Sequence, residues 1–158
     1  MNVKLNSLAI TNFDSNDLEK IKFVKELKED NLISQFLYGC IDKMIEASEK
    51  SENFVLGYGY IVLDKDNLIG FIRPARIIDN STLDIDYAVK SNYRHQGYGT
   101  KILEEASEYF FKNSDEIENI KLFIDSENVN SMSCAEKAGF IKTTESYSHL
   151  FSTYIKRR

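Results

Sequence analysis

The middle of the chain contains three consecutive segments in which apolar residues recur at every second position. They span residues 54–63, 68–78 and 83–89, and short polar turns separate them. Period two predicts β-strands, and turns this short join antiparallel neighbours. Pro74 lies inside the second segment, where we expect a bulge or an edge strand because proline cannot donate to a ladder. The fold must therefore be built around an antiparallel sheet.

Segments with helical periodicity precede this block. Apolar residues share one helical face over 18–27, behind a cap at Asp14 or Ser15, and again over 33–45 with a break at Gly39. An alternating segment at 3–10 predicts a first strand.

The pattern changes again after the block. Apolar spacing over 102–110 predicts an amphipathic helix, and 117–124 predicts a strand. A short helix over 130–138 is expected to end at Gly139 as a left-handed C′ residue. The closing strands are expected at 140–143 and 150–155.

These elements predict an α+β fold over residues 1–158, which contain no repeat or linker. We expect a single three-layer domain, with a mostly antiparallel mixed sheet of six to seven strands flanked by about four helices.

Composition excludes several classes of function. The net charge of -5 disfavours a nucleic-acid footprint or an anionic membrane surface. Two cysteines and two histidines, far apart, make neither a disulfide framework nor a structural metal site, so free thiols and no metal are expected. Neither a signal peptide nor a transmembrane run is expected, which favours the cytoplasm.

The loop from Arg94 to Thr100 lies between a predicted strand and a predicted helix. Gly97 and Gly99 allow close backbone approach to a ligand, and the first amides of the following helix have no intrahelical acceptor. Such a helix start can bind phosphate, with Thr100 as an additional hydroxyl and either Arg94 or Lys101 as the source of positive charge. A plain tight turn into a helix is the alternative.

Two better-known phosphate motifs do not fit this loop. The GxxxxGK[ST] pattern is absent, and the third glycine position of the dinucleotide fingerprint is Ile102. A nucleotide-dependent oxidoreductase is therefore disfavoured.

Two segments together resemble the motifs of the GNAT (general-control-related) N-acetyltransferase superfamily. The strand 83–89 and Arg94-His95-Gln96-Gly97-Tyr98-Gly99 look like the acetyl-CoA signature Gln/Arg-x-x-Gly-x-Gly/Ala. Asn128-Val129-Asn130-Ser131, followed by Glu136-Lys137-Ala138-Gly139-Phe140, is similar to the family's N-x-x-S and E-K-x-G-F segment. The order of elements fits over nearly the whole chain, and the pattern is closest to the branch of ribosomal-protein N-terminal acetyltransferases.

The resemblance implies a V-shaped splay between the strand ending at Val89 and the strand ending near Ile124. The pantetheine arm of acetyl-CoA would pair there with backbone groups of the first strand, and an amide at or near Val89 would polarise the thioester carbonyl. Asn128 and Ser131 would lie near the arm, although helix capping explains them equally well. The implied cofactor-binding residues are Tyr87, Ala88, Val89, Arg94, His95, Gln96, Gly97, Tyr98, Gly99, Thr100, Asn128 and Ser131.

The implied reaction is direct acetyl transfer from acetyl-CoA to an amine, which must lose a proton. Asp84 and Asp86 share one face of their strand and are the candidate bases, with a solvated strand face as the alternative. In many relatives a tyrosine protonates the leaving thiolate of coenzyme A, and the corresponding position in this chain is Ala135. His95 stands where the family often has glycine, so the loop is either less tightly wound or offers a phosphate contact.

The acceptor is expected to be a small amine, a polyamine or a peptide N-terminus, bound by a monomer or homodimer. Phe36, Tyr38, Tyr58 and Tyr60 are candidate lining residues, although core packing explains them as well. Tyr147 and His149 are further candidates, with a solvated loop as the alternative. A non-catalytic acyl-CoA-binding module on the same fold remains the alternative function.

Overall fold

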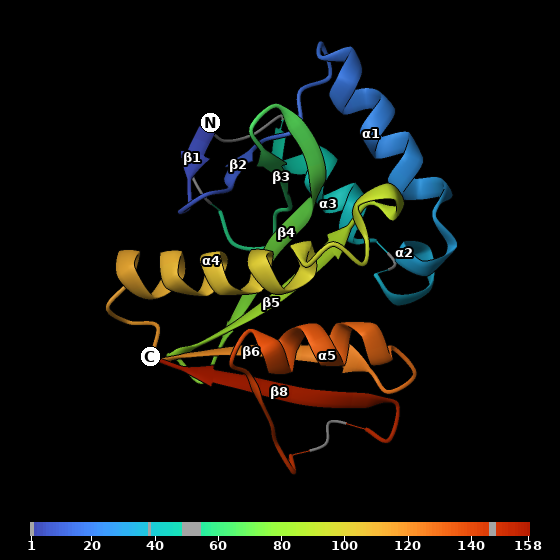
Figure 1. Cartoon of the computed structure of the whole chain (residues 1–158). Coiled ribbons are helices and arrows are strands. Elements are labelled where there is room, and N and C mark those ends of the chain that lie inside the picture. The colour runs from blue at the N-terminus through green and yellow to red at the C-terminus, as the bar shows by residue number, and fades with distance from the viewer. Residues whose placement is uncertain (1, 38, 49–54, 146–147) are drawn as a thin grey trace.

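The computed structural model describes residues 2–37, 39–48, 55–145 and 148–158. Its elements are β1 (Asn2–Lys4), β2 (Ala9–Thr11), α1 (Leu18–Glu29), α2 (Asn31–Phe36), α3 (Cys40–Ser48), β3 (Tyr60–Asp64), β4 (Asn67–Ile78), β5 (Thr82–Val89), the 3-10 turn η1 (Ser91–Tyr93), α4 (Tyr98–Asn113), β6 (Asn119–Asp125), α5 (Val129–Lys137), β7 (Ile141–Lys142) and β8 (Phe151–Arg157) (Figure 1). Among these residues, no helix is long and apolar enough to cross a membrane.

The strands form one mixed sheet in the order β1-β2-β3-β4-β5-β6-β8-β7. Every neighbouring pair is antiparallel except β5 and β6, which are parallel. The predicted α+β class and the antiparallel order of the three central strands are confirmed. The first of these strands was expected over 54–63, but it begins only at Tyr60, because the chain turns at Leu56 and Gly57. The described residues form eight strands and five α-helices, slightly more than expected.

The expected single strand at 3–10 is instead a hairpin of β1 and β2. A carboxylate of α4 causes the break: Glu105 accepts the backbone N–H groups of Asn6, Ser7 and Leu8 at 2.9–3.0 Å, and the Ser7 hydroxyl also donates to it. The turn is therefore held by a residue about 100 positions away, which local periodicity does not reveal.

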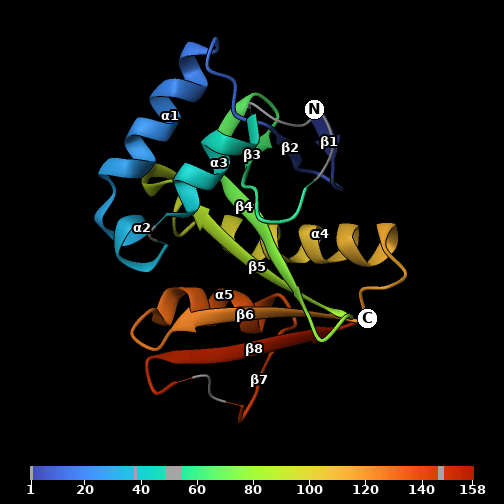
Figure 2. The same cartoon turned by 180° about the vertical axis from the view of Figure 1, so that it is seen from behind.

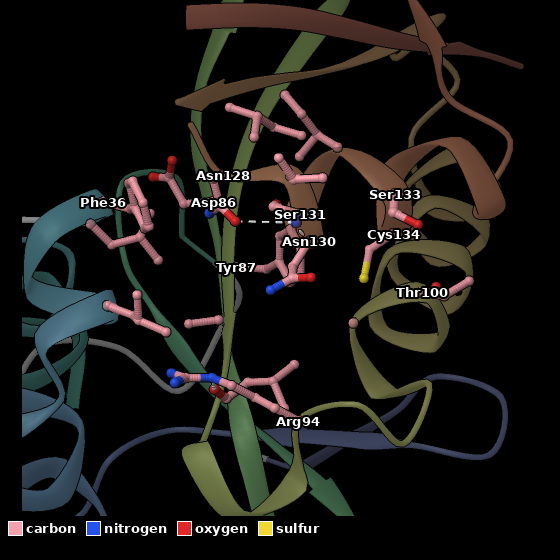
Figure 3. Close-up of a pocket in the computed structure, with 18 of the residues that line it drawn as sticks. Phe36, Asp86, Tyr87, Arg94, Thr100, Asn128, Asn130, Ser131, Ser133 and Cys134 are labelled. Carbon is pink, nitrogen blue, oxygen red and sulfur yellow. Dashed lines mark hydrogen bonds between the residues drawn. The ribbon is translucent and has the colours of Figure 1, made fainter. Parts of the chain in front are cut away.

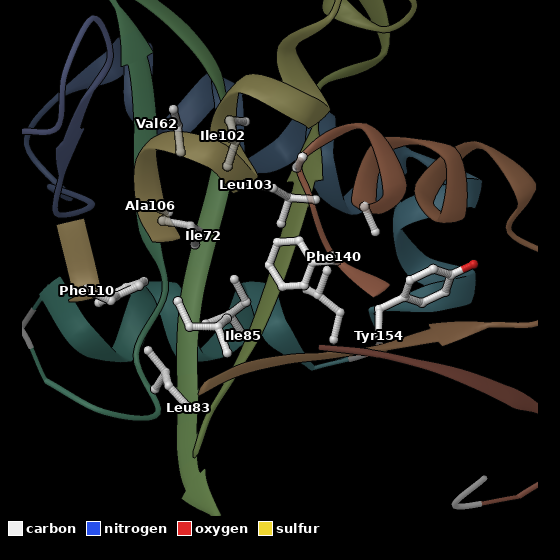
Figure 4. Close-up of a cluster of buried hydrophobic side chains, with 14 of the residues drawn as sticks. Val62, Ile72, Leu83, Ile85, Ile102, Leu103, Ala106, Phe110, Phe140 and Tyr154 are labelled. Carbon is white, nitrogen blue, oxygen red and sulfur yellow. The ribbon is translucent and has the colours of Figure 1, made fainter. Parts of the chain in front are cut away.

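Helices cover both faces of the sheet (Figures 1 and 2). On one face α4 and α5 pack against strand residues around Ile72, Leu83 and Ile85. Figure 4 shows Leu103 of α4 and Phe140, which follows α5, in this cluster. On the other face α1, α2 and α3 pack against a smaller strand surface that includes Ile61, Phe71 and Ala88, all buried. These are the expected three layers.

Short polar side chains and glycines set the helix ends. Asp17 caps α1, accepting from Glu19 N and Lys20 N, so the helix begins after Asp17 rather than at Asp14 or Ser15. Gly39, at φ +81°, separates α2 from α3, and Gly139, at φ +85°, follows the C-cap of α5. Both glycine predictions are confirmed.

The sheet opens between its two parallel strands. β5 and β6 are paired over only three positions, from Thr82 with Asn119 to Asp84 with Lys121. Beyond these pairs β5 continues to Val89 and β6 to Asp125, and the strands diverge (Figure 2). The V-shaped splay is present where the resemblance placed it.

Candidate active site

A cleft with a volume of about 560 Å³ occupies the gap between β5 and β6. Its walls come from α2, the end of β5, the loop before α4, the end of β6 and the first turns of α5. Figure 3 shows Phe36 on one side, Cys134 and Thr100 on the other, and Tyr87 and Arg94 between them. The cleft therefore brings together residues from both predicted motif segments.

The end of β5 directs backbone groups into this gap. Lys90 N donates to Ile69 O at 2.8 Å, so this pair is hydrogen-bonded in the antiparallel β4–β5 ladder. Bonded and non-bonded pairs alternate along such a ladder. Val89 and Tyr87, opposite Gly70 and Ile72, therefore direct their N–H and C=O groups away from β4, toward the gap.

The start of α4 lies at the mouth of the cleft. Gly97 is its N-cap at φ +85°, no side chain caps the helix, and a Cβ built on Gly97 would meet nothing within 4 Å. The amides of Tyr98, Gly99 and Thr100 come before the first intrahelical bond, from Lys101 N to Gly97 O at 3.1 Å. This start offers N–H donors and the positive end of the helix dipole to an anion.

His95 has a left-handed backbone conformation in this loop. It has φ +60°, in the left-handed region that favours glycine, and it is exposed at the cleft. The histidine therefore occupies a backbone conformation that glycine adopts more readily than other residues.

Gly99 serves packing more than ligand approach. A Cβ there would lie 2.8 Å from Cys134 Sγ and 3.5 Å from Tyr87 Cε2. The glycine thus allows the first turn of α4 to lie against α5 and β5, which fixes the distance between the helix start and the gap.

Arg94 ties the loop to the helices on the other side of the cleft. Its Nε donates to Val89 O at 3.0 Å and its Nη2 pairs with Asp30 Oδ2 at 2.9 Å. Asp30 also caps α2 by accepting from Leu32 N and Ile33 N. Much of the charge of Arg94 is therefore engaged within the protein.

A half-buried hydroxyl pair lies on the α5 side of the cleft. Tyr87 Oη and Ser131 Oγ are 2.9 Å apart, and burial raises the pKa of Tyr87 far enough to keep it protonated. Asn128 caps α5 by accepting from Ser131 N at 3.2 Å, so the capping role of Asn128 is present in the structure. Ala135 is fully buried, and Tyr87 brings a phenol to this helix from β5 instead.

A second cavity of about 390 Å³ adjoins the cleft, with Phe36, Leu37, Asp86 and Phe123 lining both. Asp86 therefore lies at the junction, whereas Asp84 lines only the second cavity. Burial and the neighbouring Asp86 raise the pKa of Asp84 to about 6, against the effect of Arg76. Burial also raises the pKa of Asp86, opposed by Arg73.

Two arginines that the sequence analysis missed face these carboxylates. Arg73 Nη1 lies 3.3 Å from Asp86 Oδ2, and Arg76 Nε lies 3.1 Å from Asp84 Oδ2. Residues three apart on a strand ordinarily face opposite sides, but the register shifts between Pro74 and Arg76. The expected irregularity at Pro74 is thus a bulge in a central strand, and it turns both arginines to one face. The sequence signal that could have indicated these ion pairs is the presence of an arginine on each side of Pro74, where an irregularity was expected.

Cys40 contacts both Arg73 and Asp86 of this cluster. Its Sγ accepts from Arg73 Nη1 at 3.0 Å and lies 3.6 Å from Asp86 Oδ2. Burial, with the charge of Asp86, raises the pKa of the Cys40 thiol to about 11. The thiol stays protonated at neutral pH, which disfavours Cys40 as a nucleophile.

Other predicted side chains point elsewhere. The Gln96 amide donates to Asn92 O and the Tyr98 hydroxyl to Asp64, so these two residues offer the cleft only their backbone. Tyr60 is buried in the core on the α4 side with Tyr58 against it, and exposed His149 lines neither cavity. Tyr38, Tyr147 and the start of the predicted strand at Phe54 lie outside the described residues.

Comparisons with known proteins agree with this architecture. The family model of the acetyltransferase (GNAT) domain matches residues 8–141. No curated protein sequence matches the chain.

Three solved structures illustrate the shared fold. A GNAT-family acetyltransferase from Bacillus anthracis has a TM-score of 0.71 and 18% identity, covering 98% of this chain and 96% of its own. The ribosomal L7/L12 α-N-protein acetyltransferase RimL, in complex with coenzyme A, has a TM-score of 0.76 and 14% identity, covering 99% and 98%. The aminoglycoside acetyltransferase AAC(6')-Ib, in complex with acetyl-CoA, has a TM-score of 0.73 and 19% identity, covering 97% and 94%.

Proposed function

The chain belongs to the GNAT family of acetyltransferases, and we propose that it transfers the acetyl group of acetyl-CoA directly to a primary amine. The observation that carries the proposal is the splayed gap, where the uncapped start of α4 and the N–H groups of Tyr87 and Val89 face one cleft. The amides at the mouth of the cleft can bind a pyrophosphate. The N–H groups of β5, deeper in the cleft, can pair with an extended chain that carries amide groups, as an added strand would.

Each part of the cleft has a proposed role in holding acetyl-CoA. The amides from Gly97 to Thr100, with the exposed His95 beside them, bind the pyrophosphate. The backbone of Tyr87 and Val89 binds the arm, and one of these two N–H groups polarises the thioester carbonyl. Asn128 and Ser131 form the α5 wall, and Arg94 holds the loop in place through Val89 O and Asp30.

The carboxylates of β5 are the proposed bases that remove the proton of the amine. Acetyl-CoA supplies an activated thioester, so the chain has to deprotonate the amine, whose pKa is near ~10 when it resembles lysine. Asp86 lines both cavities and is therefore the base nearer to the cleft. Asp84 is the second carboxylate, which receives the proton through a water molecule. Tyr87 is the proposed hydrogen-bond donor to the leaving sulfur, since its hydroxyl stays protonated beside Ser131.

Thermal unfolding with acetyl-CoA tests the proposal. At about 100 times its Kd a ligand stabilises a fold by about 2.7 kcal/mol, or roughly 5–10 °C for a chain of this size. Gly97→Glu should abolish the shift by placing a negative charge among the amides. Gly57→Glu is the matched control, since Gly57 has φ +86° and does not line the cleft. A wild-type protein that shows no shift, or a Gly97→Glu variant that keeps it, contradicts the assignment.

Turnover separates the enzyme from the alternative of a non-catalytic acyl-CoA-binding module. Release of free thiol from acetyl-CoA in the presence of amines is expected of the enzyme. Binding without thiol release for any amine would favour the binding module.

A further inference from the structure

We infer that the acceptor is an amino acid, that is, a primary amine that also carries a carboxylate and an apolar side chain. The inference rests on the proposed acetyl transfer, because it assigns the second cavity to the acceptor. This cavity shares Asp86 with the neighbouring cleft, so a molecule bound in it can present its amine beside that carboxylate.

The charge of the second cavity does not favour a simple cation. The charged side chains that line it are Arg73, Arg76, Asp84 and Asp86, two positive and two negative. A polyamine would find each carboxylate already paired with a guanidinium, at 3.1 and 3.3 Å. A molecule that carries both signs of charge complements this surface better.

Both arginines keep donors for an anionic group. A guanidinium has five N–H donors in a planar fork that suits a carboxylate. Arg76 pairs with Asp84 through Nε, and its side chain is 59% exposed. Arg73 contacts Cys40 and Asp86 through Nη1, and no described residue accepts a hydrogen bond from its Nη2. A carboxylate of the acceptor would accept hydrogen bonds from these remaining guanidinium donors.

The spacing of the cluster limits how far apart the two charges of the acceptor lie. Arg73 and Asp86 are in direct contact, so groups that pair with both must be close together in the ligand. An α- or β-amino acid meets this requirement, whereas a long diamine does not. Phe36, Phe123 and Phe151 supply apolar walls for its side chain, and Figure 3 shows Phe36 beside Asp86.

Calorimetric binding to the protein saturated with coenzyme A tests this inference without requiring turnover. Leucine and phenylalanine are compared with leucinamide and phenylalaninamide, which lack the carboxylate, and with spermidine. Loss of a charge-assisted carboxylate contact should raise Kd at least about tenfold for the amides. Equal or tighter binding of the amides or of spermidine overturns the inference, and so does a failure of the amino acids to bind.

Arg76→Gln provides the second measurement, since glutamine removes the positive charge but keeps a hydrogen-bond donor for Asp84. The preference for the acid over the amide should fall below about threefold. Arg157→Gln is the matched control, because Arg157 is exposed on β8, lines neither cavity and carries the same charge. A preference that survives Arg76→Gln unchanged contradicts the assignment.

The thermal shift with acetyl-CoA is recorded for the same samples. A normal shift combined with the wrong acceptor preference overturns the amino-acid inference and leaves the proposed acetyl transfer standing. Loss of the wild-type shift instead contradicts the proposed function itself.

Discussion

Gly70 lies where β4 supports the end of β5, and Gly70→Ala should disrupt that support. A Cβ on Gly70 would lie 2.0 Å from Ala88 O, 3.0 Å from Ala88 C and 3.1 Å from Val89 Cα. All three atoms belong to the backbone, so no side chain can rotate away. The strands would have to separate by roughly 1 Å or more to restore ordinary contacts.

The expected cost follows from that separation. Overpacking costs about 1–3 kcal/mol, and weakening the Lys90 N to Ile69 O bond and its neighbour adds about 1–2 kcal/mol. Alanine restricts the unfolded chain and returns about 0.4–1 kcal/mol. The free energy of unfolding should therefore fall by about 2–4 kcal/mol, which lowers Tm by roughly 5–15 °C for a chain of this length.

Urea and thermal unfolding, followed by circular dichroism without ligand, measure this change. Gly97→Ala is the control, because no atom lies within 4 Å of its added Cβ and only the positive φ costs about 1–2 kcal/mol. The displaced Val89 amide should also weaken the thermal shift with acetyl-CoA in Gly70→Ala. A Gly70→Ala protein within about 0.5 kcal/mol of wild type would refute the packing argument.

Three carboxylates give further predictions. Asp86→Asn should lower kcat by about 10²–10⁴ while the acetyl-CoA shift persists. Asp84→Asn should stabilise the protein at pH 7 by about 1–2 kcal/mol: the folded pKa of Asp84, about 6, exceeds its unfolded value, so wild type loses stability as pH rises from about 4 through 6. Urea unfolding at pH 5 and 8 measures this, and a destabilised Asn variant contradicts it. For Glu105, burial alone would raise the pKa, but hydrogen bonds from Ser7 and the turn amides outweigh it and lower the pKa. Glu105→Gln should therefore cost about 1–3 kcal/mol at pH 7, and the difference should disappear as pH falls through the lowered pKa; a pH-independent difference would contradict this.

Local signals in the sequence predicted most of the elements that frame the site. Period two identified the three central strands, although it placed the start of the first one before Tyr60, where the chain turns. Gly39 and Gly139 marked helix ends because a positive φ favours glycine. At the start of α1, several polar residues in a row can each act as a cap, and the cap is Asp17 rather than Asp14 or Ser15. Short-range spacing does not decide between them.

What the sequence did not reveal depends on contacts between distant segments. The turn between β1 and β2 exists because Glu105 in α4 binds its amides. Arg73 and Arg76 reach the carboxylates of β5 because a bulge changes the phase of β4, and the exact register of a bulge is a property of the strand pair. The sequence therefore pointed to Asp84 and Asp86 as candidate bases but did not reveal that Arg76 and Arg73 pair with them.

The divergence of β5 and β6 also affects how the sheet meets other chains. An open strand edge is a template for unwanted pairing, and this sheet has two such edges inside it. They face each other across a cleft walled by α2 and α5, where an incoming strand from another molecule has little room. The outermost strands, β1 and β7, are only three and two residues long, so pairing there would add few hydrogen bonds. The arrangement that opens the sheet for a ligand thus turns its two inner edges toward each other, away from an incoming strand.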